Sequence, residues 1–189
     1  MAPLGAARAI ITMGGDLGKL ELIQTQTVSG VAAVNFTSIQ GSSYKNHMLV
    51  FNNVTLASGN NQIGLRFYES GSIEDQAVYE WAIERIEGSS FSEQKTTGFS
   101  RLPFVWYALG TNTGANANGF CTFFNLHDSN KYSYYNTHSS GLGFGGSNGM
   151  QFGGGVMPQT STVDGIQIAH YDASVNISGT FSLYGIAED

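Results

Sequence analysis

Apolar and polar residues alternate along most of the chain from Lys19 onward, as they do in strands that bury one face. Leu20 and Leu22 alternate with charged residues, and Ile63 and Leu65 alternate with polar or small ones. The same pattern predicts strands at residues 19–22, 34–37, 48–56, 62–67, 104–109, 120–126, 131–136, 163–171 and 179–186. About ten short strands at this spacing predict an all-β fold, a two-sheet antiparallel sandwich of the jelly-roll type.

Clusters of Gly, Asn, Asp and Ser separate these strands and predict turns. They lie at residues 58–61, 110–119, 128–130 and 141–155. Because the last of these clusters is so rich in glycine, we interpret it as connecting chain. It resembles a phosphate-binding loop only superficially, since no Lys-Ser/Thr pair follows and no helical pattern begins there.

Residues 72–88 allow two interpretations. Tyr79, Ile83 and Ile86 have helical spacing behind a cap-like start, which favours a helix. The same residues also fit a strand in which Tyr79, Trp81 and Ile83 share one face. We favour the strand, because a helix would place Trp81 on its polar side.

The first eighteen residues differ from the rest, because they contain apolar residues without a sustained period. A free tail would be more polar than this. We therefore predict that residues 1–18 form an extended N-terminal arm that binds another molecule, and that residues 19–189 form a single β-sandwich domain. The apolar residues expected to contact that partner are Leu4, Ile10, Ile11 and Met13.

The composition agrees with a β-fold and narrows the function. Only 12% of the 189 residues are charged, whereas exposed helices are filled with Glu, Lys and Arg. A net charge of -6 argues against a nucleic-acid partner, because binding to the phosphate backbone requires a basic face. The longest apolar run, residues 102–109, is far shorter than the roughly 20 residues of a membrane-spanning helix. The single Cys121 excludes an intramolecular disulfide, which favours folding in a reducing cytoplasm.

Candidate catalytic and metal-binding groups are weak in this sequence. The four histidines lack the spacing of metal ligands, and we expect neither a metal nor a cofactor. Half of the 14 acidic residues fall between Glu69 and Glu93, with Arg85 as the only basic residue among them. Paired carboxylates could hydrolyse a sugar, but a solvated edge or a patch facing a basic neighbour explains the cluster more simply. We expect Cys121 to be buried and inert, and the protein not to be an enzyme.

Aromatic residues supply a second candidate chemistry. The apolar face of a sugar ring packs on a flat aromatic ring, while its hydroxyl groups bond to Asn and Gln. Because neighbouring residues of a strand point to opposite faces, the tyrosines of residues 132–135 cannot all face the core. The candidate glycan-binding residues are Trp106, Tyr107, Tyr132 and Tyr135.

Several segments resemble the β-rich structural proteins of tailed-phage virions, notably those of phages with aquatic hosts. They are residues 22–30 (LIQTQTVSG), 34–39 (VNFTSI), 44–51 (YKNHMLVF) and 179–186 (GTFSLYGI). The resemblance spans about residues 20–187, except that residues 110–155 have no counterpart. It implies a component of the phage head surface or tail and supplies no catalytic residue.

Arm, sandwich and resemblance together predict a non-enzymatic virion protein, assembled in the host cytoplasm. We expect a capsid cement or decoration protein whose arm and sandwich contact the major capsid protein or other virion proteins. Such a protein is expected to be a homo-oligomer, with a trimer as the first guess, and to need neither nucleic acid nor membrane. The alternative is a tail-fibre or baseplate adhesin that binds host surface glycans.

Overall fold

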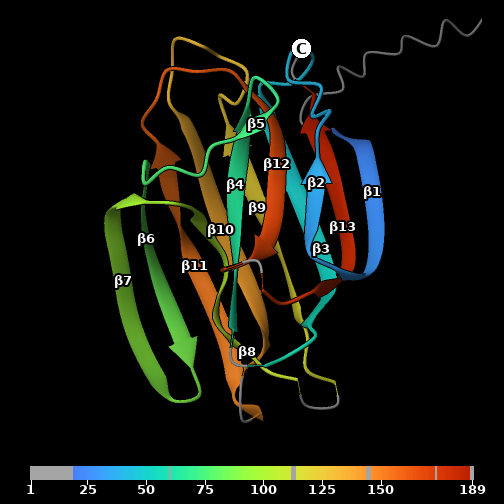
Figure 1. Cartoon of the computed structure of the whole chain (residues 1–189), viewed down its shortest axis with the longest axis vertical. Helices are drawn as coiled ribbons and strands as arrows, with labels where there is room; N and C mark the ends of the chain where they lie inside the picture. Colours follow the sequence, from blue (N-terminus) through green and yellow to red (C-terminus); the bar gives the residue numbers. More distant parts are fainter. Residues whose placement is uncertain (1–18, 60, 112–113, 144–145, 173, 188–189) are drawn as a thin grey trace, which may run out of the picture.

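The computed structural model describes residues 19–187, apart from residues 60, 112–113, 144–145 and 173. Within this range the strands form two antiparallel sheets (Figure 1). The larger sheet has eight strands in the order β1 (Leu20–Val31), β13 (Ile177–Ile186), β3 (Asn46–Leu56), β9 (Ala117–Phe124), β10 (Ser133–Leu142), β11 (Asn148–Met157), β6 (Tyr79–Glu87) and β7 (Ser90–Phe99). The smaller sheet has five strands: β2 (Ala33–Phe36), β12 (Val163–His170), β4 (Asn61–Glu69) and β5 (Ser72–Ile73) in that order, with β8 (Leu102–Leu109) paired to β4.

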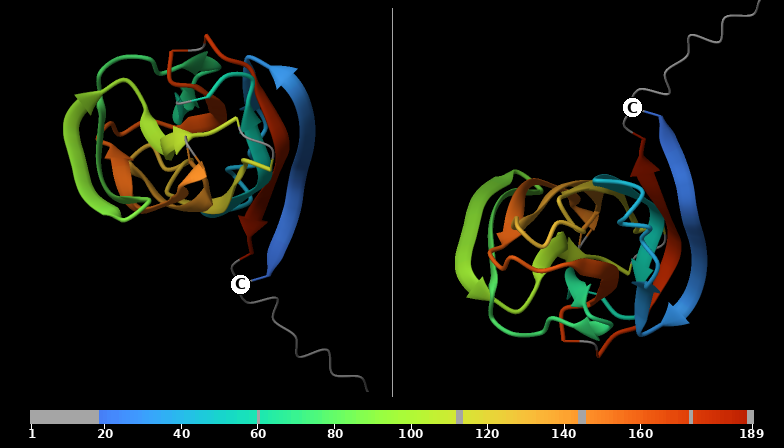
Figure 2. Two further views of the ribbon diagram at one scale, coloured as in Figure 1. Left: turned by 90° about the horizontal axis from the view of Figure 1, so that it is seen from below. Right: turned by 90° about the horizontal axis from the view of Figure 1, so that it is seen from above.

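The strand pairing is that of a jelly roll, which confirms the predicted fold class. In such a fold the first strand pairs with the last, the second with the second-last, and so on inward. Here β1 pairs with β13, β2 with β12, β3 with β9 and β4 with β8, each pair antiparallel. The remaining long strands β10, β11, β6 and β7 extend the larger sheet beyond β9. As a result the two ends of this sheet, β1 and β7, lie on opposite sides of the molecule (Figure 2).

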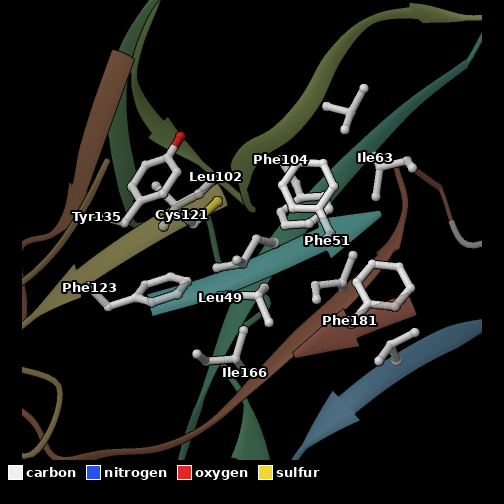
Figure 3. Packing of buried hydrophobic residues seen from close by; sticks show 14 of the residues in the cluster. Leu49, Phe51, Ile63, Leu102, Phe104, Cys121, Phe123, Tyr135, Ile166 and Phe181 are labelled. Carbon is white, nitrogen blue, oxygen red and sulfur yellow. The ribbon is translucent and has the colours of Figure 1, made fainter. Parts of the chain in front are cut away.

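The core between the sheets is aromatic and aliphatic. Phe51 of β3 packs against Phe104 of β8, with ring centroids 4.3 Å apart (Figure 3). The ring of Phe181 of β13 lies 6.3 Å from that of Phe104. Tyr135 and Phe123 reach the same core from β10 and β9. These side chains alternate with outward-facing neighbours along each strand, as the period of two predicts.

β8 accounts for the longest apolar run of the sequence, because both of its faces are covered. The extension of the larger sheet packs against it through β10, β11 and β6. Side chains of neighbouring strands also bond to its backbone. The Trp106 N–H donates to Gln151 Oε1 at 2.6 Å, Tyr135 Oη donates to the Pro103 carbonyl at 3.0 Å, and Gln62 Nε2 donates to the Trp106 carbonyl at 2.8 Å. These bonds satisfy backbone groups that the sheet leaves unpaired at a buried edge.

Two segments of the larger sheet test the local predictions. In β6 the strand interpretation of residues 72–88 is confirmed, since Tyr79, Trp81 and Ile83 are all buried on one face. The interpretation of residues 141–155 as connecting chain is wrong over most of its length, because β11 begins at Asn148.

The glycines of β11 allow its backbone to approach buried rings. A Cβ at Gly149 would overlap the Tyr107 ring, with Cε2 and Cγ only 2.8 Å away, and a Cβ at Gly155 would lie 2.8 Å from both Trp81 Cβ and Tyr135 Cε1. Glycine is therefore a packing requirement here rather than a turn signal.

The predicted arm, including Leu4, Ile10, Ile11 and Met13, lies outside the described residues, so its role stays a prediction. In the part of the chain that is described, no helix has the length and apolarity to cross a membrane.

Candidate binding face

In the strands β1, β13, β3 and β9, all of whose residues the structure describes, no charged side chain stands on the outer face of the larger sheet. We call this surface the uncharged face and define it by three cross-strand rows. These are Leu20–Ile186–Asn46–Phe124, Leu22–Tyr184–Met48–Thr122 and Thr25–Ser182–Val50–Phe120. Most of these side chains are aliphatic or aromatic, and Leu20, Leu22 and Phe120 are 45%, 59% and 39% exposed. A surface without charge on which apolar side chains predominate is typical of an interface.

The charged residues nearest to β1 point away from this face. Tyr44 Oη donates to Glu21 Oε2 at 2.6 Å, and the Tyr44 ring lies against Gly185 on the inner side of β13. Lys19 Nζ lies 3.7 Å from Glu21 Oε1 and therefore stands on the same side. The pattern of β1 thus places Leu20 and Leu22 on the outer face and Glu21 on the other.

The same three rows continue onto the sheet extension and enclose a hollow there. The row on one side runs through Tyr134, Val156 and Glu80, and the row on the other side runs through His138, Phe152 and Glu84. Between them the middle row consists of Asn136, Gly154, Ala82 and Lys95.

Because Gly154 and Ala82 have little or no side chain, the middle row lies lower than its neighbours. The resulting groove, which we call the glycine groove, has a volume of about 900 Å³ and continues into a second hollow of about 400 Å³ beside Phe152.

The walls of the glycine groove combine one aromatic ring with several polar groups. Tyr134 is 45% exposed at one side. Glu80, Asn136, Lys95 and Thr97 supply a carboxylate, an amide, an ammonium group and a hydroxyl around it. Among the described residues, these four side chains have no hydrogen-bond or ion-pair partner of their own. The groove therefore offers free donors and acceptors beside a flat apolar surface.

The acidic cluster of the sequence borders this groove. Glu84 of β6 and Glu93 of β7 are cross-strand neighbours that line the second hollow. Glu84 and Glu93 stand side by side. Glu80 lies on the other side of the middle row, but four residues of β6 separate it from Glu84, about 13 Å of strand, which exceeds the roughly 5–10 Å between the carboxyl groups of a glycoside hydrolase. Like charges on an edge hairpin also discourage the addition of a further strand to β7, which was the simpler interpretation of the cluster.

Three of the four predicted glycan-binding residues are buried in the structure. Trp106, Tyr107 and Tyr135 are 5%, 0% and 1% exposed, so their proposed contact with a sugar is wrong: the rings fill the core under the sheet extension. Tyr132 is 42% exposed but lies outside the glycine groove. The exposed ring in the groove belongs to Tyr134, which the strand period places opposite Tyr135.

The remaining candidate residues are buried or scattered. Burial raises the pKa of Cys121 to about 12, with a hydrogen bond to Thr137 acting against it, so the thiol is not a nucleophile at neutral pH. Burial also lowers the pKa of His47, whose Nε2 lies 2.8 Å from the Ile39 carbonyl. In the described ranges, no group of three or more His, Cys, Asp or Glu side chains is arranged to hold a metal ion.

Comparisons with protein-family models, with curated proteins and with solved structures gave no match. The arrangement of the outer face therefore carries the functional argument.

Neither surface was predicted from the sequence. The signal for the uncharged face was present, since the outward positions of β1, β3, β9 and β13 could be read from the period of two. What was missing was the order of the strands, which brings those positions together.

Proposed function

We propose that the protein is a non-enzymatic structural protein of a phage particle that self-associates through the uncharged face. The observation that carries this proposal is the absence of charge from three rows across the fully described strands β1, β13, β3 and β9. The resemblance of residues 22–51 and 179–186 to phage virion proteins supplies the setting.

A second copy is the occupant that best fits the uncharged face. In a closed ring of copies, one part of this surface on each copy packs against another part on the next copy, and such apolar contacts need no complementary charge. A neighbouring copy would cover Leu20, Leu22 and Phe120, the most exposed apolar side chains of the face. A trimer around this face remains our first choice of oligomer.

On a capsid, such oligomers act as decoration or cement. Each contact that spans two shell subunits must break before the shell opens. Every 100 Å² of apolar surface buried in such a contact stabilises it by about 2.5 kcal/mol. Symmetry repeats this contribution over many copies. The arm of residues 1–18 is the segment proposed to contact the major capsid protein.

Antibody labelling of purified particles of the encoding phage tests the role in the virion. Gold-labelled antibody against the full chain should decorate the head surface in electron micrographs. Label confined to the tail tip would instead support the adhesin, and particles without label would contradict both roles.

The adhesin is the second candidate, because the glycine groove presents Tyr134 beside free polar groups. The two roles are compatible in one molecule, since the groove lies on the sheet extension and the uncharged face on the jelly-roll strands.

A further inference from the structure

We infer that the glycine groove binds a neutral saccharide. This inference deepens the second candidate function and does not depend on the self-association of the chain. It rests on the shape of the groove, on its one exposed ring and on the charge of its walls.

The shape of the groove follows from small residues in the middle row of the sheet extension. Gly154 of β11 lies between Asn136 of β10 and Ala82 of β6. A Cβ at Gly154 would lie 2.7 Å from Asn136 Oδ1, so even one methyl group would intrude on the amide. A floor of backbone and methyl groups accommodates a flat ring of ligand.

The ring of Tyr134 forms the apolar side of this floor. It is 45% exposed, although its neighbours Ser133 and Tyr135 on β10 are buried. Neighbouring strands are about 4.8 Å apart, so Tyr134 stands within one strand spacing of Val156 and two of Glu80. The C–H face of a pyranose packs on such a ring while its hydroxyl groups point toward the polar wall.

The polar wall matches the hydroxyl groups of a sugar, each of which donates one hydrogen bond and accepts others. Glu80 accepts, Lys95 and Thr97 donate, and the amide of Asn136 does both. Because these side chains have no partner among the described residues, they can bond to a ligand without breaking internal bonds.

The charges favour a neutral saccharide over an anionic one. Glu80, Glu84 and Glu93 line the two joined hollows, and Lys95 is the only cation among their lining residues. An anionic sugar would meet a surplus of carboxylates. An extended peptide is also disfavoured, because it would need the free edge of a sheet, and the groove lies on the face of strands that are already paired.

A glycan array with the labelled full chain tests this inference. We expect binding to neutral hexose-containing glycans, reduced about tenfold by Tyr134→Ala through loss of the stacking surface. Ala82→Leu should reduce binding to a similar extent, because it fills the floor at an exposed strand position and leaves Tyr134 in place. Phe91→Ala is the control, since this ring is 70% exposed on β7 and lines neither hollow, and its binding should equal that of the wild type.

Three outcomes would overturn the inference: no binding by the wild-type chain, binding to acidic glycans alone, or binding that survives both groove variants. Light scattering on the same variants separates this question from self-association. An unchanged molecular mass with lost glycan binding supports the groove, whereas a reduced mass would show that the groove belongs to the contact between copies.

Discussion

Gly149→Ala tests the packing of the sheet extension, because two interpretations of this residue predict changes of opposite sign in the free energy of unfolding. If Gly149 lay in connecting chain, alanine would stabilise the protein by about 0.4–1 kcal/mol by restricting the unfolded chain. Its backbone is not left-handed, so alanine causes no conformational strain of its own. In β11, however, the new Cβ overlaps the fully buried ring of Tyr107.

The size of the effect follows from the contact. Three carbons of the Tyr107 ring lie within 2.8 Å of the new Cβ, closer than real Cβ contacts come. The ring is held in the core and cannot swing into solvent, so backbone and ring must shift together. Overpacking of this kind costs about 1–3 kcal/mol. We expect Gly149→Ala to lower the free energy of unfolding by that amount.

Urea unfolding followed by tryptophan fluorescence measures this change. The same substitution in a Tyr107→Val background provides the control, because valine lacks the Cδ2 and Cε2 carbons that the new Cβ would overlap. The cost of alanine should then fall by at least about 1 kcal/mol, as expected for residues in contact. A Gly149→Ala protein as stable as the wild type would refute the placement of β11 against Tyr107.

Further predictions concern buried titratable groups. His47 has a lowered pKa because it is buried, so its neutral form stabilises the fold above the unfolded-state pKa of about 6.5, and this stability is lost as the pH falls below that value. Between pH 7.5 and 5.5 the wild type should lose more unfolding free energy than His47→Gln; equal losses for the wild type and the variant would contradict this. Cys121 should resist a thiol reagent at pH 8 in the folded protein and react fully in urea, because burial raises its pKa to about 12; fast labelling of the native chain would refute it.

The period of two predicted the jelly-roll strands well, because each has one buried and one solvated face. Ile63, Leu65 and Phe67 of β4 show this directly, since all three are buried. The same period placed Tyr134 and Tyr135 on opposite faces without saying which face was the core. Local sequence cannot decide that question, because it depends on the partner strands.

The predictions failed where long-range packing sets the residue type. Gly149 and Gly155 occur in a strand because Tyr107, Trp81 and Tyr135 come close to its backbone from other strands. β7 was missed for a related reason: its outward residues Glu93 and Lys95 belong to an exposed edge hairpin with little apolar pattern. The uncharged face and the glycine groove arise from strand order, which no single segment records.

The molecular mass of the full chain in solution tests self-association through the uncharged face most directly. By light scattering, the molecular mass of the wild type should be at least twice the 20.2 kDa of one chain, and three times that value for a trimer. Leu22→Asp should reduce it to that of a single chain, because an unpaired carboxylate inside the contact costs several kcal/mol. Phe91→Asp, at a 70% exposed position on β7, should leave the oligomer intact. A monomeric wild type, or a Leu22→Asp protein that keeps its full mass, would contradict the account.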